Sequence, residues 1–188
     1  MPAEPTAGLP RGVRLGIDVG TVRIGVAASD PDGVIATPVR TVARPVAAPE
    51  PGPGEPPDVA ELAAIVADRS VYVVYVGLPK HLSGAEGSAS GAVRTYCCAL
   101  AHAINPVPVR VVDERLSTVT AHQALYASGR SGRRHREVVD QAAAVVILQS
   151  AIDAERAAGA RVGELVLPDV GADPARVSRG NDPRRGKD

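Results

Sequence analysis

LGIDVGTVRIGVAAS, residues Leu15–Ser29, is the stretch that decides the predicted fold. It is typical of two short β-strands joined by a tight turn, and Gly20 stands where a hairpin turn demands an unusual backbone conformation. The first arm alternates, so Leu15 and Ile17 share one face and Asp18 points to the other. The segment therefore predicts an antiparallel hairpin with one carboxylate near the end of its first strand.

The glycines of this hairpin give a reason to treat Asp18 as a site residue. Gly16 and Gly25 leave bare backbone on the side of the carboxylate, as expected where a metal ion, a phosphate or another backbone comes close. An acid in such a place is costly to bury without a partner. A carboxylate that only caps a turn is the alternative, so a site needs further residues to support it.

Composition limits the classes of protein to which the chain can belong. Its 188 residues are 45% hydrophobic, which is enough for one domain with a sizeable core, and they include no Phe, no Trp and four Tyr. The formal net charge is zero, so nucleic acid would have to bind to local basic patches. The scarcity of aromatic residues argues against modules that read single strands by stacking bases on rings.

Cysteine content and hydropathy predict a cytoplasmic protein. Cys97 and Cys98 are adjacent in a predicted helix, which suits neither a disulfide framework nor a metal motif, and at most one of them can face the core. We interpret them as small thiols in a reducing compartment, with an intermolecular disulfide through the outward-facing one as the alternative. The chain shows no signal peptide and no membrane-length apolar run, which predicts no membrane contact.

Turn signals divide the chain into one domain and its appendages. We expect a flexible leader over residues 1–12, a folded domain over residues 13–167 with a Pro-rich insertion at residues 44–57, and a disordered tail over residues 168–188. The insertion, RPVAAPEPGPGEPP, holds six prolines in fourteen residues. This composition indicates an extended segment that does not pack on the domain.

The periodicity inside the domain predicts an α/β fold with a mixed sheet. Pro38 suits an edge strand, and the apolar run VYVVYV at residues 71–76 suits a strand covered on both faces. Strands are expected at 34–41, 71–76 and 107–112, and helices from Asp58 as N-cap to 68, from the polar loop 80–87 to about 104, at 119–127 and at 138–158, with 163–167 as an edge strand or a surface segment. We expect five strands, three antiparallel and two parallel, flanked by helices.

Three acids stand out by their positions in this scheme. Asp18 ends the first strand, Glu114 lies just past the strand at 107–112, and Asp140 lies in the first turn of the helix at 138–158. With the strands that carry Asp18 and Glu114 side by side, the two carboxylates would approach each other at one edge of the sheet.

The long helix can bring Asp140 to the same point. The face of Asp140 is shared by Ala143, Ala144, Ile147 and Ala151. Such small residues let a helix lie close to a sheet. Three gathered carboxylates repel one another unless a cation sits among them, and their hard oxygen ligands suit Mg²⁺ or Mn²⁺ rather than Zn²⁺. The usual work of such a site is to activate water and to stabilise a phosphoryl transition state.

Four motifs, in order, resemble those of one family. They are GIDVGTVRIGVAASD, VGLPKHLSGAEG, VDERLSTVTA and VDQAAAVVILQS, and they run from about Val13 to Ala158. The chain is similar to the YqgF/RuvX family of bacterial pre-16S rRNA nucleases, also described as Holliday-junction-resolvase-like, which have a ribonuclease H-like fold. The resemblance implies that Asp18, Glu114 and Asp140 are metal-binding catalytic acids and that Mg²⁺ (or Mn²⁺) is the cofactor.

Two positions need comment beside this resemblance. His81 stands where the family commonly has Asn, which leaves the substrate contact of its loop open. Asp113 precedes Glu114 and points the opposite way in an extended segment, so we expect Glu114 to be the acid that reaches the metal ions.

Several cations are candidates for binding a nucleic-acid backbone. The predicted flexible loop at residues 128–136, SGRSGRRHR, either clamps the phosphates of a polyanion or is a solvated loop. Arg115 either contacts phosphate or orients Glu114, and Arg23 either contacts phosphate or is a solvated hairpin residue. The substrate-binding candidates are Arg23, Lys80, Arg115, Arg130, Arg133, Arg134 and Arg136.

These residues together predict a metal-dependent endonuclease. By the resemblance its substrate is the 5′ region of precursor 16S rRNA. A resolvase of branched DNA is the alternative; it would use the same acids and should be a symmetric dimer, so a monomer and a homodimer both stay open. An actin- or sugar-kinase-like ATPase shares the D-x-G-T loop but needs two such domains, and the chain has no G-x-x-x-x-G-K-[ST] loop. A scaffold that binds nucleic acid without cutting is left for an assay to exclude.

Overall fold

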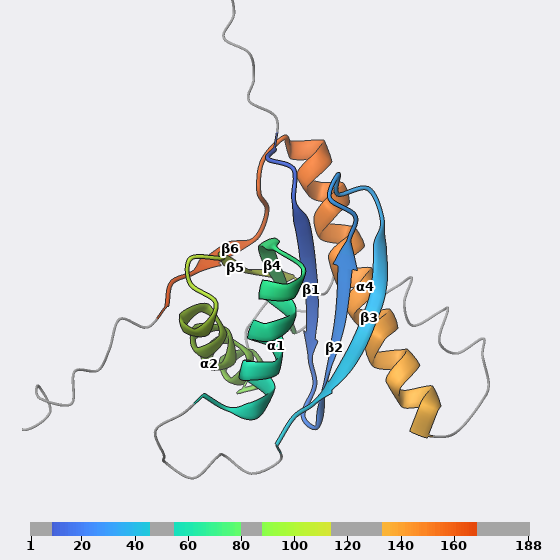
Figure 1. Ribbon diagram of the computed structural model, residues 1–188, viewed down its shortest axis with the longest axis vertical. Helices are drawn as coiled ribbons and strands as arrows, with labels where there is room; N and C mark the ends of the chain where they lie inside the picture. The colour runs from blue at the N-terminus through green and yellow to red at the C-terminus, as the bar shows by residue number, and fades with distance from the viewer. Residues whose placement is uncertain (1–8, 46–54, 80–87, 114–132, 169–188) are drawn as a thin grey trace, which may run out of the picture.

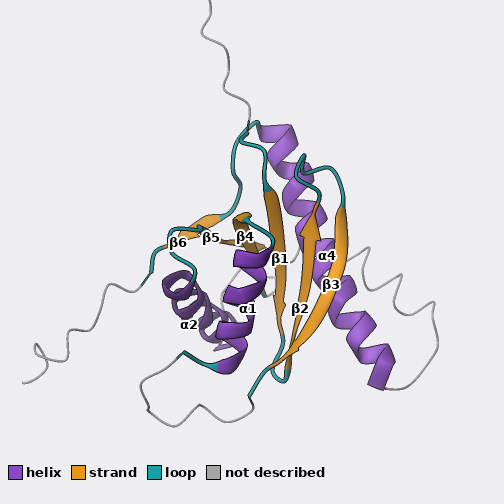
Figure 2. Ribbon diagram, in the orientation of Figure 1, coloured by secondary structure: helices purple, strands orange, loops and turns teal. Residues whose placement is uncertain are grey.

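A computed structural model describes residues 9–45, 55–79, 88–113 and 133–168 of the chain, in which one mixed six-stranded sheet is covered by helices on both faces (Figure 1, Figure 2). The strand order is β3-β2-β1-β4-β5-β6. The elements are β1 (Val13–Val19), β2 (Arg23–Ser29), β3 (Ala36–Ala43), α1 (Pro57–Asp68), β4 (Val71–Leu78), α2 (Ser88–Ala103), β5 (Val109–Asp113), α4 (Arg133–Ala158) and β6 (Glu164–Val166).

The antiparallel half of the sheet is built from the predicted hairpin. β1 pairs with β2, and Asp18 lies opposite Gly25. β3 pairs with β2 and forms the edge of the sheet, as predicted for the strand that contains Pro38. The register shifts between Val26 and Ala27, beside Pro38, where the missing N–H donor is tolerated.

The parallel half brings three strand ends to one edge of the sheet. β1, β4 and β5 run parallel, with Ile17, Val76 and Val111 aligned across them. Three antiparallel strands followed by two parallel ones are the ribonuclease H-like arrangement that was expected. One expected detail is wrong, because β4 lies between β1 and β5 and these two strands are not neighbours.

The sheet has six strands rather than five. β6 pairs with β5 in the antiparallel sense, so the segment at residues 163–167 forms the edge strand that was one of its two expected states. Side chains hold this short strand in place: Arg94 on α2 pairs with both carboxylate oxygens of Glu164 at 2.9 and 3.0 Å. Arg110 also donates to the carbonyl oxygens of Val162 and Gly163 at 2.6 and 2.7 Å. A strand of three residues is too short for its periodicity to predict.

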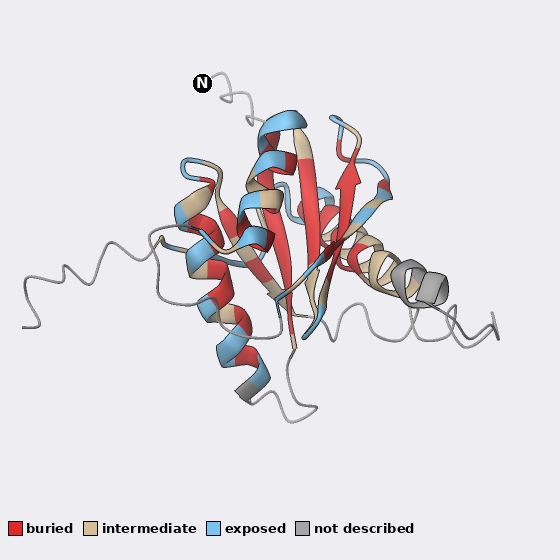
Figure 3. Ribbon diagram, turned by 60° about the horizontal axis from the view of Figure 1, so that its bottom comes forward, coloured by how far each residue is buried: buried red, intermediate tan, exposed pale blue. Residues whose placement is uncertain are grey.

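Two apolar clusters lie on opposite faces of the sheet, and the buried positions run along its central strands (Figure 3). α1 and α2 cover the first cluster, which contains Leu15 and Ile17. α4 covers the second, where Leu148 packs with Tyr75. Gly16 lies under α4, and a Cβ atom there would be 2.9 Å from the Ala144 carbonyl oxygen. A metal ion, a phosphate or another backbone was expected close to this glycine, and in the structure it is the backbone of α4.

Two helices begin differently from the prediction. α1 begins at Pro57, and Asp58 is buried inside its first turn rather than acting as its N-cap, because proline is preorganised for that turn. α4 begins at Arg133 rather than at Val138. The arginines at 133, 134 and 136 are therefore helical, not part of a loop, which agrees with the good helix propensity of arginine. The helix predicted at 119–127 lies outside the described residues.

A buried charge cluster anchors the C-terminal half of α4 to the sheet. Glu155 is 1% exposed and Arg14 on β1 is 4% exposed. Arg14 Nε lies 3.2 Å from Glu155 Oε2, Arg161 Nη1 lies 2.6 Å from Glu155 Oε1, and the Tyr75 hydroxyl donates to the same Oε1. Two guanidinium groups and a hydroxyl thus compensate one buried carboxylate, which an unpaired acid could not tolerate.

The cysteines behave as their sequence position predicts. Cys97 is buried and Cys98 is partly exposed, so one thiol of the pair faces the core. Burial, with the neighbouring Cys98, raises the pKa of the Cys97 thiol to about 12, which makes it a poor nucleophile at neutral pH. In the part of the chain that the structure describes, no helix is both long and apolar enough to cross a membrane.

Candidate active site

Asp18 lies near the carboxyl end of β1, on the face that α4 covers. Its partner across the hairpin, Gly25, is the point where α4 touches β2: a Cβ atom on Gly25 would overlap the carbonyl oxygen of Asp140. The missing side chain therefore lets the helix backbone rest directly on the strand. This contact holds the backbone of Asp140 against β2, near Asp18. The contact of Gly16 with the backbone of Ala144 confirms the expectation that α4 lies close to the sheet at its small residues.

The two carboxylates influence each other. Burial, followed by the negative charge of Asp140, raises the pKa of Asp18 from an ordinary value of 3.8 to about 6. At neutral pH Asp18 is still mostly ionised, but its charge is poorly solvated. A cation bound beside the two carboxylates would offset this cost.

Arg23 supplies one positive charge to this pair. As the first residue of β2, it lies two residues before Gly25 and so on the same face of the strand. Its Nε donates to Asp140 Oδ2 at 2.9 Å, and the two side chains are 25% and 27% exposed. Arg23 thus pairs with one of the candidate acids instead of being a solvated hairpin residue, and its expected contact with phosphate stays a prediction.

The third predicted acid, Glu114, lies outside the described residues. The last described residue of β5 is Asp113, which is opposite Leu78 of β4 at the edge where the parallel strands end. Val112 packs against the cluster under α4, and Glu114 follows it by two positions in sequence. Among the described residues, no three His, Cys, Asp or Glu side chains lie close enough together to hold a metal ion. The predicted set of three acids includes Glu114, which is not among those residues.

The predicted substrate-binding cations are only partly placed. Arg133, Arg134 and Arg136 belong to the start of α4, and Asp140 follows further along the same helix rather than in its first turn. The structure describes the backbone of these three arginines but not their side chains. Lys80, Arg115 and Arg130 lie outside the described residues.

Sequence reasoning missed Arg44 as a support of the site. Its Nη1 donates to the Gly20 carbonyl oxygen at 2.8 Å, and its backbone amide donates to the Val22 carbonyl oxygen at 3.0 Å. The guanidinium also lies 5.0 Å from the centre of the Tyr96 ring on α2, a cation–π contact. Arg44 thus ties the turn between Asp18 and Arg23 to the opposite helix layer. Its position at the start of the Pro-rich stretch gave no sign of this role.

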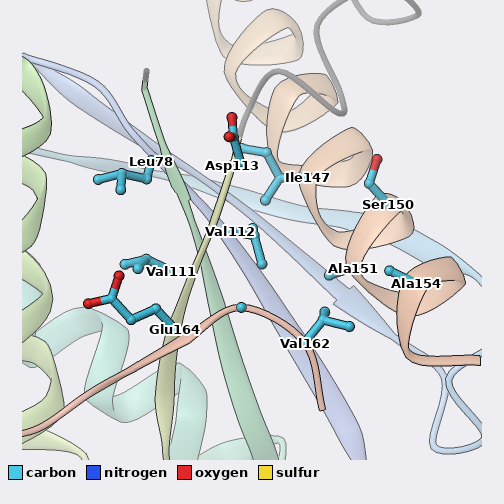
Figure 4. A pocket seen from close by; sticks show the side chains of 11 residues that line it. Leu78, Val111, Val112, Asp113, Ile147, Ser150, Ala151, Ala154, Val162 and Glu164 are labelled. Carbon is cyan, nitrogen blue, oxygen red and sulfur yellow. The ribbon is translucent and has the colours of Figure 1, made fainter. Parts of the chain in front are cut away.

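A cavity of about 290 Å³ lies between α4, β5 and the chain leading into β6 (Figure 4). Its walls are mainly apolar and include Ile147 of α4 and Val112 of β5, with Asp113 at one end. Asp18, Arg23 and Asp140 do not line it. The cavity is therefore not part of the candidate site.

The donor set fits a hard divalent cation. Carboxylate oxygens are the ligands that Mg²⁺ and Mn²⁺ prefer, and Asp18 and Asp140 provide such oxygens close to each other. In the described part of this site, the side chains that can bind a metal ion are the carboxylates of Asp18 and Asp140, and both offer oxygen ligands. This chemistry suits phosphodiester hydrolysis better than redox or nucleophilic thiol chemistry.

Comparison with known proteins identifies close relatives. A family model described as "RuvX: Holliday junction resolvase" matches residues 12–154. A "Putative pre-16S rRNA nuclease" of Nocardioides sp. is 52% identical over 157 residues, which cover 82% of this chain and 96% of the relative. A protein of the same description from Streptomyces coelicolor is 51% identical and covers 82% of this chain and 87% of its own. The solved structure "T. thermophilus RuvC in complex with Holliday junction substrate" aligns at 17% identity with a TM-score of 0.44, over 80% of this chain and 98% of that one.

Proposed function

The chain belongs to the RuvX family, and on that premise we propose that it is a metal-dependent endonuclease with Asp18, Glu114 and Asp140 as its catalytic acids. The observation that carries the proposal is the Asp18–Asp140 pair, in which a glycine contact holds two carboxylates together at the edge where the parallel strands end. A purely structural pair of acids would be expected to separate or to gain full compensation, as Glu155 does.

The roles of the residues follow from their positions. A bound Mg²⁺ or Mn²⁺ ion would supply the positive charge that activates water and stabilises the transition state of phosphodiester hydrolysis. Asp18 and Asp140 would hold it in their ionised forms, with Glu114 as the third ligand. The contact of Gly25 with α4 holds Asp140 near Asp18, and Arg44 holds the turn between β1, which carries Asp18, and β2, which carries Gly25.

The substrate proposed is the 5′ region of precursor 16S rRNA, because the similar proteins carry the description of pre-16S rRNA nucleases. Branched DNA is the second candidate, which the description of the matching family model favours. A resolvase must cut two strands symmetrically and should be a dimer. A measurement of the molecular mass in solution therefore helps to choose between the two substrates, because a dimer favours branched DNA.

The arginines at the start of α4 are proposed to hold the substrate backbone. With a helical rise of about 1.5 Å per residue, Arg136 is about 6 Å and Arg133 about 10 Å along the axis from Asp140. Both arginines are thus close to the proposed catalytic acid along the helix. Arg130, Arg134, Lys80 and Arg115 are proposed to extend this contact, which supplies affinity without reading sequence.

One cleavage experiment tests the whole proposal. Precursor 16S rRNA and a four-way DNA junction are incubated side by side with Mg²⁺, with Mn²⁺ and with EDTA. We expect cleavage that needs metal and that Asp140→Asn abolishes, whereas Asp153→Asn, an exposed acid on the same helix, leaves it intact. Cleavage in EDTA, or unchanged cleavage by Asp140→Asn, would refute the assignment; the preferred substrate decides between the two candidates.

A further inference from the structure

We propose that Arg23 is a counter-ion that competes with the divalent cation for Asp140. In the metal-free protein its guanidinium neutralises this carboxylate, and the cation must displace it on binding. The inference rests on the proposed function, because it takes Asp140 to be a metal ligand.

The fold itself places Arg23 beside Asp140. Its strand, β2, is pinned to α4 two residues later, where Gly25 meets the backbone of Asp140. The guanidinium and the carboxylate therefore approach each other from two elements that are already in contact. The resulting Nε–Oδ2 distance of 2.9 Å is that of a charge-assisted hydrogen bond.

The local charges explain why a cation is held there. Asp18 and Asp140 are like charges in a partly buried place, and a positive group is needed to keep both near one another. The structure places the Arg23 guanidinium on one of them. A divalent ion bound to the same carboxylates would meet this guanidinium as a neighbouring positive charge, so the two cations oppose each other.

The geometry of the pair favours displacement over a permanent role. The contact is a single N–H···O bond and not a bidentate fork, and about a quarter of each side chain remains exposed. Such a bond can open without burying an unpaired charge. The released guanidinium would remain beside the site, where a substrate phosphate would be a new partner for it.

The competing explanation is that Arg23 orients Asp140 for metal binding through its second oxygen. The two roles predict opposite signs. If Arg23 competes with the cation, removing its charge strengthens metal binding. If it orients the ligand, removing it weakens metal binding.

The test measures metal binding without nucleic acid. Mn²⁺ and Mg²⁺ are titrated calorimetrically into the full-length protein, into Arg23→Gln and into Arg23→Lys. We expect Arg23→Gln to bind the ion about three- to tenfold more tightly, as the loss of one partly exposed opposing charge implies. Arg23→Lys keeps the charge and should stay near the original affinity. The rise in melting temperature on adding metal should likewise be larger for Arg23→Gln.

A matched control removes an arginine ion pair elsewhere. Arg40 lies 3.2 Å from Glu61, between β3 and α1, and both side chains are more exposed than those of the Arg23 pair. Arg40→Gln should leave metal affinity unchanged. Circular dichroism checks that each variant is folded, and Arg23→Lys provides a second reading of the charge effect.

The outcomes separate this inference from the proposed function. Unchanged or weaker metal binding by Arg23→Gln, while the original protein binds metal and cleaves, overturns the competition alone. Failure of the original protein to bind either ion, together with cleavage in EDTA, overturns both. Equal tightening in Arg40→Gln would show a general charge effect and would also overturn the role assigned to Arg23.

Discussion

Replacing Asp18 with Asn should stabilise the metal-free protein at neutral pH while abolishing cleavage. The pKa of Asp18 rises from 3.8 to about 6 on folding, chiefly through burial and then through the charge of Asp140. At about 1.4 kcal/mol for each pKa unit, ionised Asp18 lowers the free energy of unfolding by about 3 kcal/mol at pH 7. Asn carries no charge but keeps some cost of burying an amide, so we expect a gain of about 1 to 3 kcal/mol.

The sign of the pH dependence follows from linkage. Because the folded-state pKa lies above the unfolded-state value, the folded protein binds more protons between the two. The favourable contribution of protonated Asp18 is complete below about pH 4 and is lost as pH rises through about 6. The difference in stability between Asp18→Asn and the original protein should therefore be large at pH 7 and nearly vanish by pH 4.

Urea denaturation in EDTA, followed by circular dichroism between pH 4 and pH 8, measures this difference. Asp32→Asn is the control, because Asp32 is exposed and lies in a surface ion pair with Arg11. It should change stability by less than about 1 kcal/mol. Added Mg²⁺ should raise the melting temperature of the original protein more than that of Asp18→Asn. If the gain in free energy of unfolding from Asp18→Asn is no larger at pH 7 than at pH 4, the electrostatic account is refuted. Retained cleavage by Asp18→Asn would refute the assignment of Asp18 to the active site.

Three further substitutions test other parts of the structure. Gly25→Ala should push α4 away from β2 and lower both the free energy of unfolding and the rate of cleavage. Its control is Gly91→Ala in α2, where the space around the residue is open, so the change should be neutral or stabilise the protein by up to about 1 kcal/mol. Urea titrations measure both effects. Glu155→Gln should cost about 3 to 5 kcal/mol because it leaves buried arginine charge uncompensated, and an unchanged urea midpoint would contradict the cluster's role. Changing the four arginines of residues 130–136 to Ala should weaken nucleic-acid affinity, and the slope of log affinity against log salt should fall by about 0.7 to 0.9 per lost phosphate contact. An unchanged slope would mean a solvated segment.

The β1–β2 hairpin, the edge strand, the central strand β4 and the approach of Asp140 to Asp18 were predictable from the sequence because local patterns determine them. Alternation fixes the faces of β1, and Pro38 marks its strand as an edge. The apolar run of β4 marks a central strand. The same alternation places Asp18 and Gly25 on the face that α4 covers, so the close approach of the helix could be expected before the structure was known.

Contacts between distant residues could not be predicted in this way. Arg14 and Glu155 are 141 positions apart, and neither strand nor helix periodicity states which buried charges will meet. Arg44 was assigned to a proline-rich stretch by composition, although its side chain reaches Gly20 and Tyr96. The pairing of Arg23 with Asp140 had a partial signal, since Arg23 lies two positions from Gly25, but the helix register that delivers Asp140 comes only from packing.

The α4-facing residues of β1 explain how the fold can tolerate an unfavourable site. Arg14, Gly16 and Asp18 alternate along one strand and meet α4 at three successive points. At Arg14 a buried carboxylate on the helix is fully compensated, and at Gly16 the helix rests on the strand itself. About 13 Å from Arg14 along the strand, Asp18 faces Asp140, and Arg23 pairs with only one of these two carboxylates. Because the first two contacts hold the helix in place, it cannot swing away to relieve the third. The part of the repulsion that Arg23 does not offset therefore persists in the folded protein, and a bound cation would relieve it.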